Sequence, residues 1–596
     1  MNDLYLPNHE HGPRLIISDH LHSEKYRLAN EDYRAKCNRV AASLCDDDQH
    51  FHNYRDLTLD MRFLEAGRIQ SAMGSPRQVT PYNCFVSGTI EDSFIDGEGA
   101  IMARASEAAE TMRRGGGIGY DFSTLRPNGA LIKSLQSRSS GPVSFMKIFD
   151  AVGRCVASSG HRRGAQMGVL RIDHPDVMEF ILAKQNLTEL QGFNISLGVT
   201  DRFMECLETG REFPLQWQDR IYDEVDPHEL WEMIMRSTWD WADPGVLFID
   251  QINRLNNLYY CETIAATNPC GEQPLPPYGA CLLGSFNLVR YIKRQQVRTG
   301  WEQTDIGEEF YFDWDLFRHD IPIVVRALDN VVDRATYPLP QQEAEAKAKR
   351  RMGLGITGLA NAGEALGNRY GDARFIEFEM EVLSVLQEEA YLASCDLAAE
   401  KGPFPLFDKE LYLKGQFVQG LSDKVRHAIA TKGIRNSHLL SIAPTGTISF
   451  TADYVSSGCE PVFEHEGQRL VNFSEGERIV KVSDYAFREW GIKGKLAAEV
   501  TADEHLDVLS AATVLVDSAV SKTCNVDKTM PWEDFKNLYR KAYDLGAKGC
   551  TTFNKDGKKM GILMGKADNE EDDKGAPLDE NATCRIDPLT GEKDCG

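Results

Sequence analysis

The chain has 596 residues, of which 42% are hydrophobic and 26% charged, and its formal net charge is −24. It is long enough for a large core or several domains, and no apolar run approaches the roughly 20 residues needed to cross a bilayer. The excess of acidic over basic residues disfavours a polyanion-binding surface, so we expect neither a nucleic-acid nor a membrane partner. Fourteen cysteines without a CxxC pair argue against a disulfide scaffold and a structural zinc site, and an N-terminus without a signal pattern predicts a cytoplasmic protein.

The first part of the chain has helical character. Charged and apolar positions recur at helical spacing up to about residue 60, which predicts a helical cap before the main domain. Cys84-Phe-Val-Ser87 then predicts a short strand, and Asp92-Ser93 predicts a helix start with these two residues as caps. Taken alone, Cys84 is typical of a buried structural thiol.

Two small-residue segments follow. Arg113–Gly119 predicts a glycine-rich strand at a sheet edge, and Ser134–Gly141 predicts a polar, flexible loop. Backbone N–H groups that are not covered by side chains, and arginine side chains, can hydrogen-bond anions, so both segments are candidates for residues near a bound phosphate. The alternative for both is a surface turn.

Long helices alternate with short apolar strands in the rest of the chain. Asp226-Pro-His-Glu229 has the cap, proline and acid of a helix start, and the apolar spacing predicts helices over Asp372–Glu400 and Pro531–Leu545, followed by Gly402 and Gly546. This alternation predicts an α/β architecture.

The segment Gly353–Gly358 fits the dinucleotide-binding fingerprint letter for letter. That motif requires a buried strand before it, whereas Gln342–Arg351 has the composition of a helix. The acid expected about 20 residues later would be Glu377 or Glu379, inside the predicted long helix. We therefore expect no Rossmann site here.

The stretch Ala266–Leu288 is too rich in proline and glycine for a regular helix or strand, which predicts a shaped loop. It carries the thiols of Cys270 and Cys281, the carboxylate of Glu272 and the carboxamide of Asn268. Reactive groups this dense on a constrained backbone indicate a functional site. The alternative is a surface turn with incidental buried cysteines.

A second candidate site follows an apolar run that begins at Asn436. A glycine flanked by hydroxyls at a strand end, with a helix start after it, directs backbone N–H and hydroxyl groups at an anion. The candidates are Thr445, Gly446, Thr447 and Ser449, and a capped turn is the alternative.

The C-terminal part begins with a predicted last strand at Gly549–Lys555. Lys566–Asn581 is acidic and polar, as in a disordered linker, and Cys584 and Cys595 follow it. Two thiols on a flexible tail suit a redox shuttle that is oxidised in a site and reduced outside.

Asn268-Pro-Cys-Gly-Glu272 followed by Cys281-Leu-Leu-Gly-Ser-Phe-Asn-Leu288 resembles the finger loop of the ribonucleotide reductase catalytic subunit. Further motifs match this family in order over about residues 60 to 555. The resemblance implies a ten-stranded α/β barrel of two five-stranded parallel halves around the finger loop. The expected domains are an N-terminal helical segment at 1–60 without a nucleotide-binding cone, the barrel at 61–560 and a flexible redox tail at 561–596.

The resemblance also implies roles for individual residues. Cys270 would be a transient thiyl radical that takes the ribose 3′-hydrogen, Glu272 the general base, and Asn268 a hydrogen-bonding partner of the sugar. Cys84 and Cys281 would supply two electrons, close as a disulfide and be reduced again by the tail cysteines. The motif at 445–449 would hold the substrate phosphates. An allosteric deoxynucleoside triphosphate or ATP would bind at Asp92, Ser93, Ser134, Arg138, Gln191 and Asn194.

The radical source and the partners follow from the same resemblance. Relatives with a ferritin-like dimetal subunit relay the electron through two adjacent tyrosines near the last strand, where this chain has Cys550-Thr-Thr-Phe553. The sequence therefore favours the class II type with adenosylcobalamin, and the dimetal partner subunit is the alternative. We further expect a homodimer and a thioredoxin- or glutaredoxin-like reductant, whereas diphosphate and triphosphate substrates both remain open.

Two other functions would need different features. A non-catalytic nucleotide-binding regulator predicts the loss of Cys84, Cys270, Glu272 or Cys281, and all four are present. A nicotinamide-dependent oxidoreductase would use the glycines at 353–358.

Overall fold

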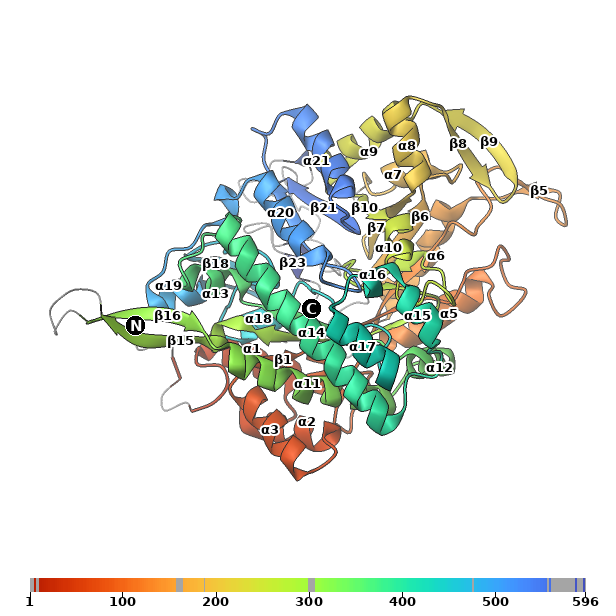
Figure 1. The fold of residues 1–596 in the computed structure, drawn as a ribbon. Helices are drawn as coiled ribbons and strands as arrows, with labels where there is room; N and C mark the ends of the chain where they lie inside the picture. The colour runs from red at the N-terminus through yellow and green to blue at the C-terminus, as the bar shows by residue number, and fades with distance from the viewer. Residues whose placement is uncertain are drawn as a thin grey trace.

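The computed structural model describes residues 5–6, 10–156, 165–186, 188–298, 306–473, 476–554, 557–558, 585–586 and 593–594. These residues form a mixed α/β fold in which helices surround the strands (Figure 1).

The N-terminal part is helical, as predicted. Helices α1 (Ile16–Tyr26), α2 (Tyr33–Leu44) and α3 (Asp48–Leu59) precede a short strand, β1 (Phe63–Glu65), and helix α4 (Gly67–Ala72). Asp32 and Asp47 cap α2 and α3, because their carboxylates accept the N–H groups of Ala35 and His50. Helices α2 and α3 pack against the long helix α11 (Trp314–Arg334), so this segment lies against the main body.

The first sheet has the strand order β13-β2-β3-β6-β7-β10-β21-β20. Its central strands β2, β3, β6, β7 and β10 run parallel to one another. They span Cys84–Val86, Gly117–Asp121, Gln166–Arg171, Phe193–Val199 and Gly245–Phe248. The strand at Cys84 is confirmed, but the glycine-rich strand β3 is not at an edge as predicted, because it lies between β2 and β6.

A second group of strands contains β14 (Leu283–Asn287) and β17 (Gly353–Thr357), which are parallel, with β1 antiparallel on the other side of β14. Isolated parallel bridges continue this group from Leu354 to Leu440 and from Ile442 to Val520. Strands β20 (Thr523–Val526) and β21 (Gly549–Asn554) are also parallel to each other. The strand predicted at Gly549 is therefore confirmed.

The two groups meet antiparallel at two places. Strand β10 pairs with β21, and β13 (Ala280–Cys281), which leads directly into β14, pairs with β2. Each parallel group thus borders the other through one antiparallel pair of strands on each side.

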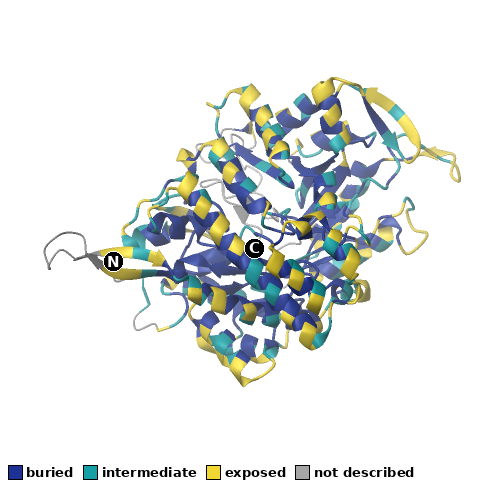
Figure 2. Cartoon of the chain, in the orientation of Figure 1, coloured by how far each residue is buried: buried dark blue, intermediate teal, exposed yellow. Residues whose placement is uncertain are grey.

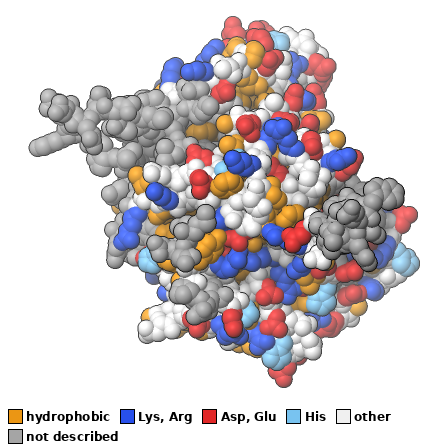
Figure 3. All heavy atoms as spheres, turned by 90° about the vertical axis from the view of Figure 1, so that its left-hand side faces the viewer, with side chains coloured by type: hydrophobic (Ala, Val, Ile, Leu, Met, Phe, Trp, Pro, Cys, Tyr) orange, Lys and Arg blue, Asp and Glu red, His pale blue; other side chains and the backbone are white. Residues whose placement is uncertain are grey.

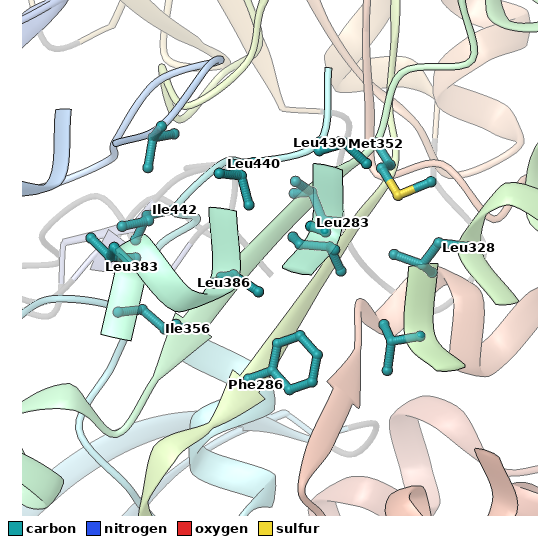
Figure 4. Close-up of a cluster of buried hydrophobic side chains, with 14 of the residues drawn as sticks. Leu283, Phe286, Leu328, Met352, Ile356, Leu383, Leu386, Leu439, Leu440 and Ile442 are labelled. Atoms are coloured by element: carbon teal, nitrogen blue, oxygen red, sulfur yellow. The ribbon is translucent and has the colours of Figure 1, made fainter. Parts of the chain in front are cut away.

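The other helices pack outside the strands, and burial falls from the strands outwards (Figure 2). The second group is packed against α11 and α14 (Ala373–Lys401), where Leu328, Leu383 and Leu386 meet strand residues such as Leu283 and Ile356 (Figure 4). The first sheet packs against α5 (Ile101–Arg113), α6 (Pro142–Cys155), α7 (Val177–Leu182), α8 (Asp201–Thr209), α9 (Pro227–Trp241), α20 (Ala502–Thr513) and α21 (Trp532–Asp544).

The remaining elements are shorter or peripheral. The helices are α10 (Ile249–Arg254), α12 (Pro340–Lys349), α13 (Leu359–Ala365), α15 (Lys409–Lys414), α16 (Gln416–Gln419), α17 (Asp423–Lys432), α18 (Gly446–Thr451) and α19 (Tyr485–Trp490), with short 3-10 turns η1 (Leu288–Tyr291) and η2 (Ala497–Glu499). Two-stranded hairpins are β4 (Leu131–Ile132) with β5 (Ser137–Arg138), β8 (Phe213–Trp217) with β9 (Arg220–Val225), β11 (Ala266–Thr267) with β12 (Pro274–Leu275), β15 (Ile292–Arg298) with β16 (Ile306–Phe312), β18 (Glu466–Phe473) with β19 (Gly476–Ser483), and β22 (Arg585–Ile586) with β23 (Lys593–Asp594).

The three helix predictions with caps are confirmed. Asp226 caps α9, α14 begins after the capping residue Asp372 and ends at Gly402, and α21 follows Pro531. The segment before Gly353 is helix α12, and Glu379 lies inside α14, as expected for a chance match to the dinucleotide fingerprint. The glycines at 353–357 form a buried strand and not a phosphate-binding turn.

Within the part of the chain that the structure describes, none of the helices combines the length and apolar character needed to cross a bilayer. On the face drawn in Figure 3, acidic and basic side chains are interspersed.

Candidate functional site

The predicted reactive loop is a tight hairpin. Strands β11 and β12 pair Ala266 with Leu275 and Thr267 with Pro274, which leaves residues 268–273 as the tip. Inside the tip, the Asn268 N–H donates to Gln273 O at 3.2 Å, and the Gln273 N–H donates to Asn268 Oδ1 at 3.0 Å. Gly271 has φ +84°, a left-handed conformation that favours glycine. The backbone on either side of Cys270 is therefore fixed by hydrogen bonds within the hairpin tip itself.

The first sheet makes room for this hairpin at two glycines. A Cβ on Gly119 would lie 1.9 Å from Thr267 O, so β11 can cross β3 only because this residue has no side chain. A Cβ on Gly117 would lie 3.1 Å from Cys84 Sγ and 3.3 Å from Pro269 Cγ, which places both groups beside β3. Gly117 and Gly119, which belong to the segment predicted to lie near a phosphate, thus leave the space in which the hairpin packs.

Both strand groups hold the tip by hydrogen bonds. Asn194 on β7 donates its side-chain amide to Pro269 O at 2.9 Å. From the other side, Ala519 N and Ser441 Oγ donate to Glu272 O at 3.0 and 2.9 Å. The residues on either side of Cys270 are therefore fixed from opposite sides of the molecule.

Cys84 and Cys281 face each other across an antiparallel pair of strands. The register of β2 and β13 makes them direct partners, and neither is in a disulfide. Burial, followed by the nearby charges of Glu272, Cys84 and Cys270, raises the pKa of Cys281 well above its ordinary value. Glu272, Cys84 and Cys270 thus lie close enough to Cys281 to raise its pKa, and Cys281 stays a neutral thiol.

Asn268 and Glu272 are both buried in the tip. Asn268 is 0% exposed, and its Nδ2 finds no hydrogen-bond partner among the described residues. A buried donor without a partner costs about 1–3 kcal/mol, so such a group in a functional site is suited to meet a ligand acceptor.

The hydroxyl-rich segment also has the predicted local structure. Thr445 adopts a left-handed conformation with φ 58°, and α18 begins at Gly446. Thr445 Oγ1 lies 3.0 Å from Thr357 Oγ1 and accepts the Gly458 N–H at 2.7 Å. Ser449 Oγ donates to Gly446 O at 2.9 Å, so the hydroxyls of Thr445 and Ser449 shape the turn, while Thr447 is half-buried.

The predicted helix start at Asp92 is wrong. Residues 91–100 form bends and turns, and α5 begins only at Ile101, because glycines at 97 and 99 interrupt the segment. Asp92 instead forms an ion pair with Arg126 at 2.6 Å, and Ser93 Oγ accepts the Asp96 N–H at 3.1 Å. Arg126 also donates to Leu131 O at 3.3 Å and so joins Asp92 to the hairpin β4–β5.

The other expected effector residues lie on two segments. Ser134 is at the exposed tip of β4–β5, and Arg138 on β5 donates to Gly129 O at 2.7 Å. Gln191 lies just before β7, and its side-chain amide is 3.5 Å from Glu189 O. Asn194 is the second residue of β7 and donates to Pro269 O, so this segment links the expected effector region with the reactive hairpin.

Cys584 and Cys595 lie outside the described residues. Between them, the short strands β22 and β23 pair Arg585 with Asp594 and Ile586 with Lys593. Strand β23 lies against α18, beside the expected phosphate site (Figure 1).

Several contacts were not apparent from sequence. Ala519 and Arg126 lie in no predicted motif, and Ser441 lies in the apolar run that begins at Asn436 without a role predicted for it, although each holds a predicted segment in place. Tyr278, in the second half of the predicted loop, lies with its ring 5.2 Å from the guanidinium of Arg104 on α5. Its left-handed φ of 64° is the kind of feature that the neighbouring prolines could have indicated.

Comparisons with known proteins agree with the geometry. A family model described as ribonucleotide reductase, barrel domain, matches residues 82–553. The vitamin B12-dependent ribonucleoside-diphosphate reductase of Mycobacterium tuberculosis (strain CDC 1551 / Oshkosh) is 33% identical over 518 residues, which cover 81% of this chain and 69% of the relative. The protein of the same name from Thermoplasma acidophilum is 34% identical over 80% of this chain and 62% of its own length. The ribonucleoside-diphosphate reductase subunit alpha of Chlamydia pneumoniae is 26% identical over 64% of this chain and 40% of its own length.

Proposed function

Because this chain belongs to the ribonucleotide reductase family, we propose that it replaces the ribose 2′-hydroxyl of ribonucleotides by hydrogen. The observation that carries the proposal is the opposed thiol pair Cys84 and Cys281 beside a hairpin tip that presents Cys270. A pair that can close to a disulfide and a third thiol that can carry a radical are what this reduction requires.

The proposed chemistry assigns one task to each side chain. A thiyl radical on Cys270 takes the 3′-hydrogen of the sugar, and Glu272 accepts the 3′-hydroxyl proton. Cys84 and Cys281 supply two electrons and two hydrogens, so the 2′-hydroxyl leaves as water and the two sulfurs form a disulfide. The neutral state of Cys281 supports this assignment, since its raised pKa means that a proton donor holds its proton at working pH.

Asn268 completes the proposed sugar site. Its buried Nδ2 is a donor that a ribose hydroxyl would satisfy. We further propose that Thr445, Gly446, Thr447 and Ser449 bind the substrate phosphates at the first turn of α18, where backbone N–H groups lack helical partners.

We propose that the strands close into a ten-stranded barrel around the hairpin. One half would be β2, β3, β6, β7 and β10. The other would be β14, β17, the segments at 440–442 and 520–526, and β21. Two antiparallel joints and the parallel bridges at Leu440 and Val520 support this closure.

Adenosylcobalamin is the proposed radical source. At the hairpin tip, no atom of the described residues other than Gly271 and its two chain neighbours lies within 4 Å of the position that a Cβ of Gly271 would take, so the tip is not covered at this point. When bound, this cofactor supplies an organic radical by cleavage of its cobalt–carbon bond. The relatives named vitamin B12-dependent support this choice, as does the sequence Thr551-Thr-Phe553 where a tyrosine pair would serve a dimetal partner subunit.

The regulatory part of the proposal concerns the region around the exposed hairpin β4–β5. Deoxynucleoside triphosphates or ATP would bind near Asp92, Ser93, Ser134, Arg138, Gln191 and Asn194. The large apolar side chains exposed around this region favour a homodimer; these are Phe94, Ile95, Met102, Leu131 and Leu135.

Re-reduction would use the C-terminal tail. Cys584 and Cys595 flank the paired residues Arg585 and Asp594, and we propose that they exchange with the Cys84–Cys281 disulfide and then with a thioredoxin- or glutaredoxin-like protein. The expected location is the cytoplasm, where thiols of this kind stay reduced. The tail at 561–596, the barrel at 61–560 and the helical segment at 1–60 are the proposed domains.

The test is turnover of ribonucleoside diphosphates and triphosphates by the purified chain with dithiothreitol. We expect deoxyribonucleotide only when adenosylcobalamin is added. Activity that appears only with a ferritin-like dimetal subunit would overturn the class II assignment, and no product under either condition would overturn the reduction itself.

A further inference from the structure

Lys548 is a buried cation that the proposed chemistry does not use. It precedes β21 directly, is 4% exposed, and its backbone carbonyl accepts the Phe248 N–H from β10 at 3.0 Å. Its Nζ donates to Val516 O at 3.1 Å, to Asp517 O at 2.7 Å and to Ser518 O. An ammonium has three donors, and here all three go to consecutive carbonyls of one segment.

That segment leads directly to the reactive hairpin. Ala519, the next residue, donates its N–H to Glu272 O at 3.0 Å. Ser441 Oγ donates to the same oxygen at 2.9 Å. Ala519 and Ser441 thus hold the backbone oxygen of Glu272 together, and Ala519 follows the three residues whose carbonyls Lys548 binds.

The other side of the segment is fixed as well. The Asp517 carboxylate accepts the N–H groups of Leu439 and Leu440 at 2.7 and 2.9 Å and the hydroxyl of Tyr391 at 2.7 Å. Movement of residues 516–518 is therefore opposed by Asp517 on one side and by Lys548 on the other.

Burying the Lys548 ammonium in this space carries a free-energy cost of desolvation. A charge taken out of water costs several kcal/mol, and an apolar side chain of similar volume is often neutral or stabilising in its place. The groups that face Lys548 are the Asp517 charge, the neutral His438 and the Phe417 ring, whose centroid lies 5.8 Å from Nζ. What the ammonium provides here and an apolar side chain could not is its three hydrogen bonds to residues 516–518.

We propose that Lys548 is a positioning residue that holds residues 516–519 and thereby fixes Glu272 beside Cys270. It acts through Ala519 and does not touch the reacting atoms. The inference rests on the proposed role of Glu272 as general base, but the geometric part can be tested without any reaction.

The first test is hydrogen exchange of the Ala519 amide in Lys548→Met, measured at single-residue resolution. Methionine keeps the volume of lysine and removes the three donors. We expect exchange at Ala519 to rise at least about tenfold, the factor that a lost interaction of about 1.4 kcal/mol would produce. The matched control is Lys541→Met, since Lys541 is half-exposed on α21 and pairs with Asp503 at 2.7 Å. Equal protection of Ala519 in both variants would overturn the proposal.

The second test separates positioning from general stability. In Lys548→Met we expect kcat per folded molecule to fall about 10- to 100-fold with the nucleotide Kd unchanged, whereas a purely structural role would lower only the melting temperature. Ser441→Ala removes the second donor to Glu272 O, and the effects of the two substitutions should be non-additive. Additive effects on kcat would contradict a shared action on Glu272.

If Lys548→Met does not fold, the wild-type protein supplies the test. Burial lowers the pKa of Lys548 to about 8, so the third donor is lost as pH rises through this value. Exchange at Ala519, corrected for the intrinsic rate, should then lose protection above about pH 8, and constant protection up to about pH 9.5 would overturn the proposal. If the exchange results hold but no ribonucleotide is reduced, the proposed function fails and the positioning contact stands.

Discussion

Two hairpins with strands of only two residues each carry predicted functional residues, and they differ in almost every physical respect. The hairpin β11–β12 is buried, and its tip is held by Asn194 from one side and by Ser441 and Ala519 from the other. The hairpin β4–β5 is exposed, and its main link to the body is Arg126, which joins Asp92 to Leu131 O.

The difference matches what each hairpin is proposed to do. A radical on sulfur must meet one sugar carbon and no other donor, so the tip must be preorganised and shielded. A segment that answers to an effector must instead have room to change when the ligand binds, which a loosely held surface hairpin has.

The strongest way to break this comparison is to remove the sulfur at the buried tip. Cys270→Ala should lower turnover by on the order of 10⁴-fold or more, because the remaining residues cannot start the reaction. Nucleotide binding, measured by equilibrium dialysis, should stay within about twofold, since the change removes one atom. Cys155→Ala, at an exposed thiol, is the control and should have full activity. Residual turnover of more than a few per cent in Cys270→Ala would exclude the thiyl role.

The next prediction concerns the glycines that accommodate each hairpin. Gly119→Ala would place a Cβ 1.9 Å from the backbone oxygen of Thr267, so the buried hairpin must shift. We expect a loss of about 1–3 kcal/mol in the free energy of unfolding, and turnover near that of Cys270→Ala.

The matched change in the exposed region is Gly129→Ala. Gly129 has φ +76°, and no described atom outside Gly129 and its two chain neighbours lies within 4 Å of the position that a Cβ would take, so the expected cost is backbone strain of about 1 kcal/mol. Its basal turnover should match that of the wild type. Thermal unfolding and steady-state kinetics of both variants decide the point. Equal activity in the two variants would mean that the position of the hairpin is not critical.

The contrast between the hairpins also explains what could be predicted from sequence. The thiols, carboxylate and carboxamide of Ala266–Leu288 lie within one stretch of chain, so their proximity follows from local geometry. The helix cap Asp226 and the helix end at Gly402 are local signals too, and these predictions are confirmed. The partners of the hairpin are far away in sequence, and only the fold brings Ser441 and Ala519 to Glu272 O.

The two wrong predictions have the same origin. The sequence predicts Asp92 as a helix cap. In the structure the Asp92 carboxylate forms an ion pair with Arg126, and the helix begins only at Ile101, after the glycines at 97 and 99. The sequence also predicts Arg113–Gly119 at a sheet edge, but β3 is central, and its small residues admit the hairpin. Glycine content indicates a special backbone position in both cases, but not which tertiary contact requires it.

A smaller effect is expected for the reactivity of Cys281. Its pKa is raised well above the ordinary value by burial and by Glu272, Cys84 and Cys270, so little thiolate is present between about pH 7 and 9. After reduction with dithiothreitol, iodoacetamide should modify Cys281 at least about 100-fold more slowly than Cys155, because burial keeps Cys281 both protonated and covered, whereas Cys155 is exposed. Peptide mapping by mass spectrometry measures both rates. The same raised pKa means that this group contributes stability below about pH 8.5, which is lost at higher pH. Rapid modification of Cys281 at about pH 8 would show that the site is open or the thiol ionised.

The smallest effect on the free energy of unfolding is expected for a substitution in the exposed hairpin β4–β5. Leu135 is 71% exposed at the tip of β4–β5, so Leu135→Ser should alter the free energy of unfolding by no more than about 0.5 kcal/mol. If the exposed apolar residues around it form a dimer contact, the same substitution should raise the dimer Kd about tenfold, which analytical ultracentrifugation can measure. Val514→Ser is the control, because Val514 is 56% exposed directly after α20, which lies well apart from β5 in Figure 1. A dimer Kd that responds equally to both substitutions would assign the association to another surface. A dimer Kd that responds only to Leu135→Ser would show that the exposed β4–β5 hairpin forms part of the contact with a second copy of the chain.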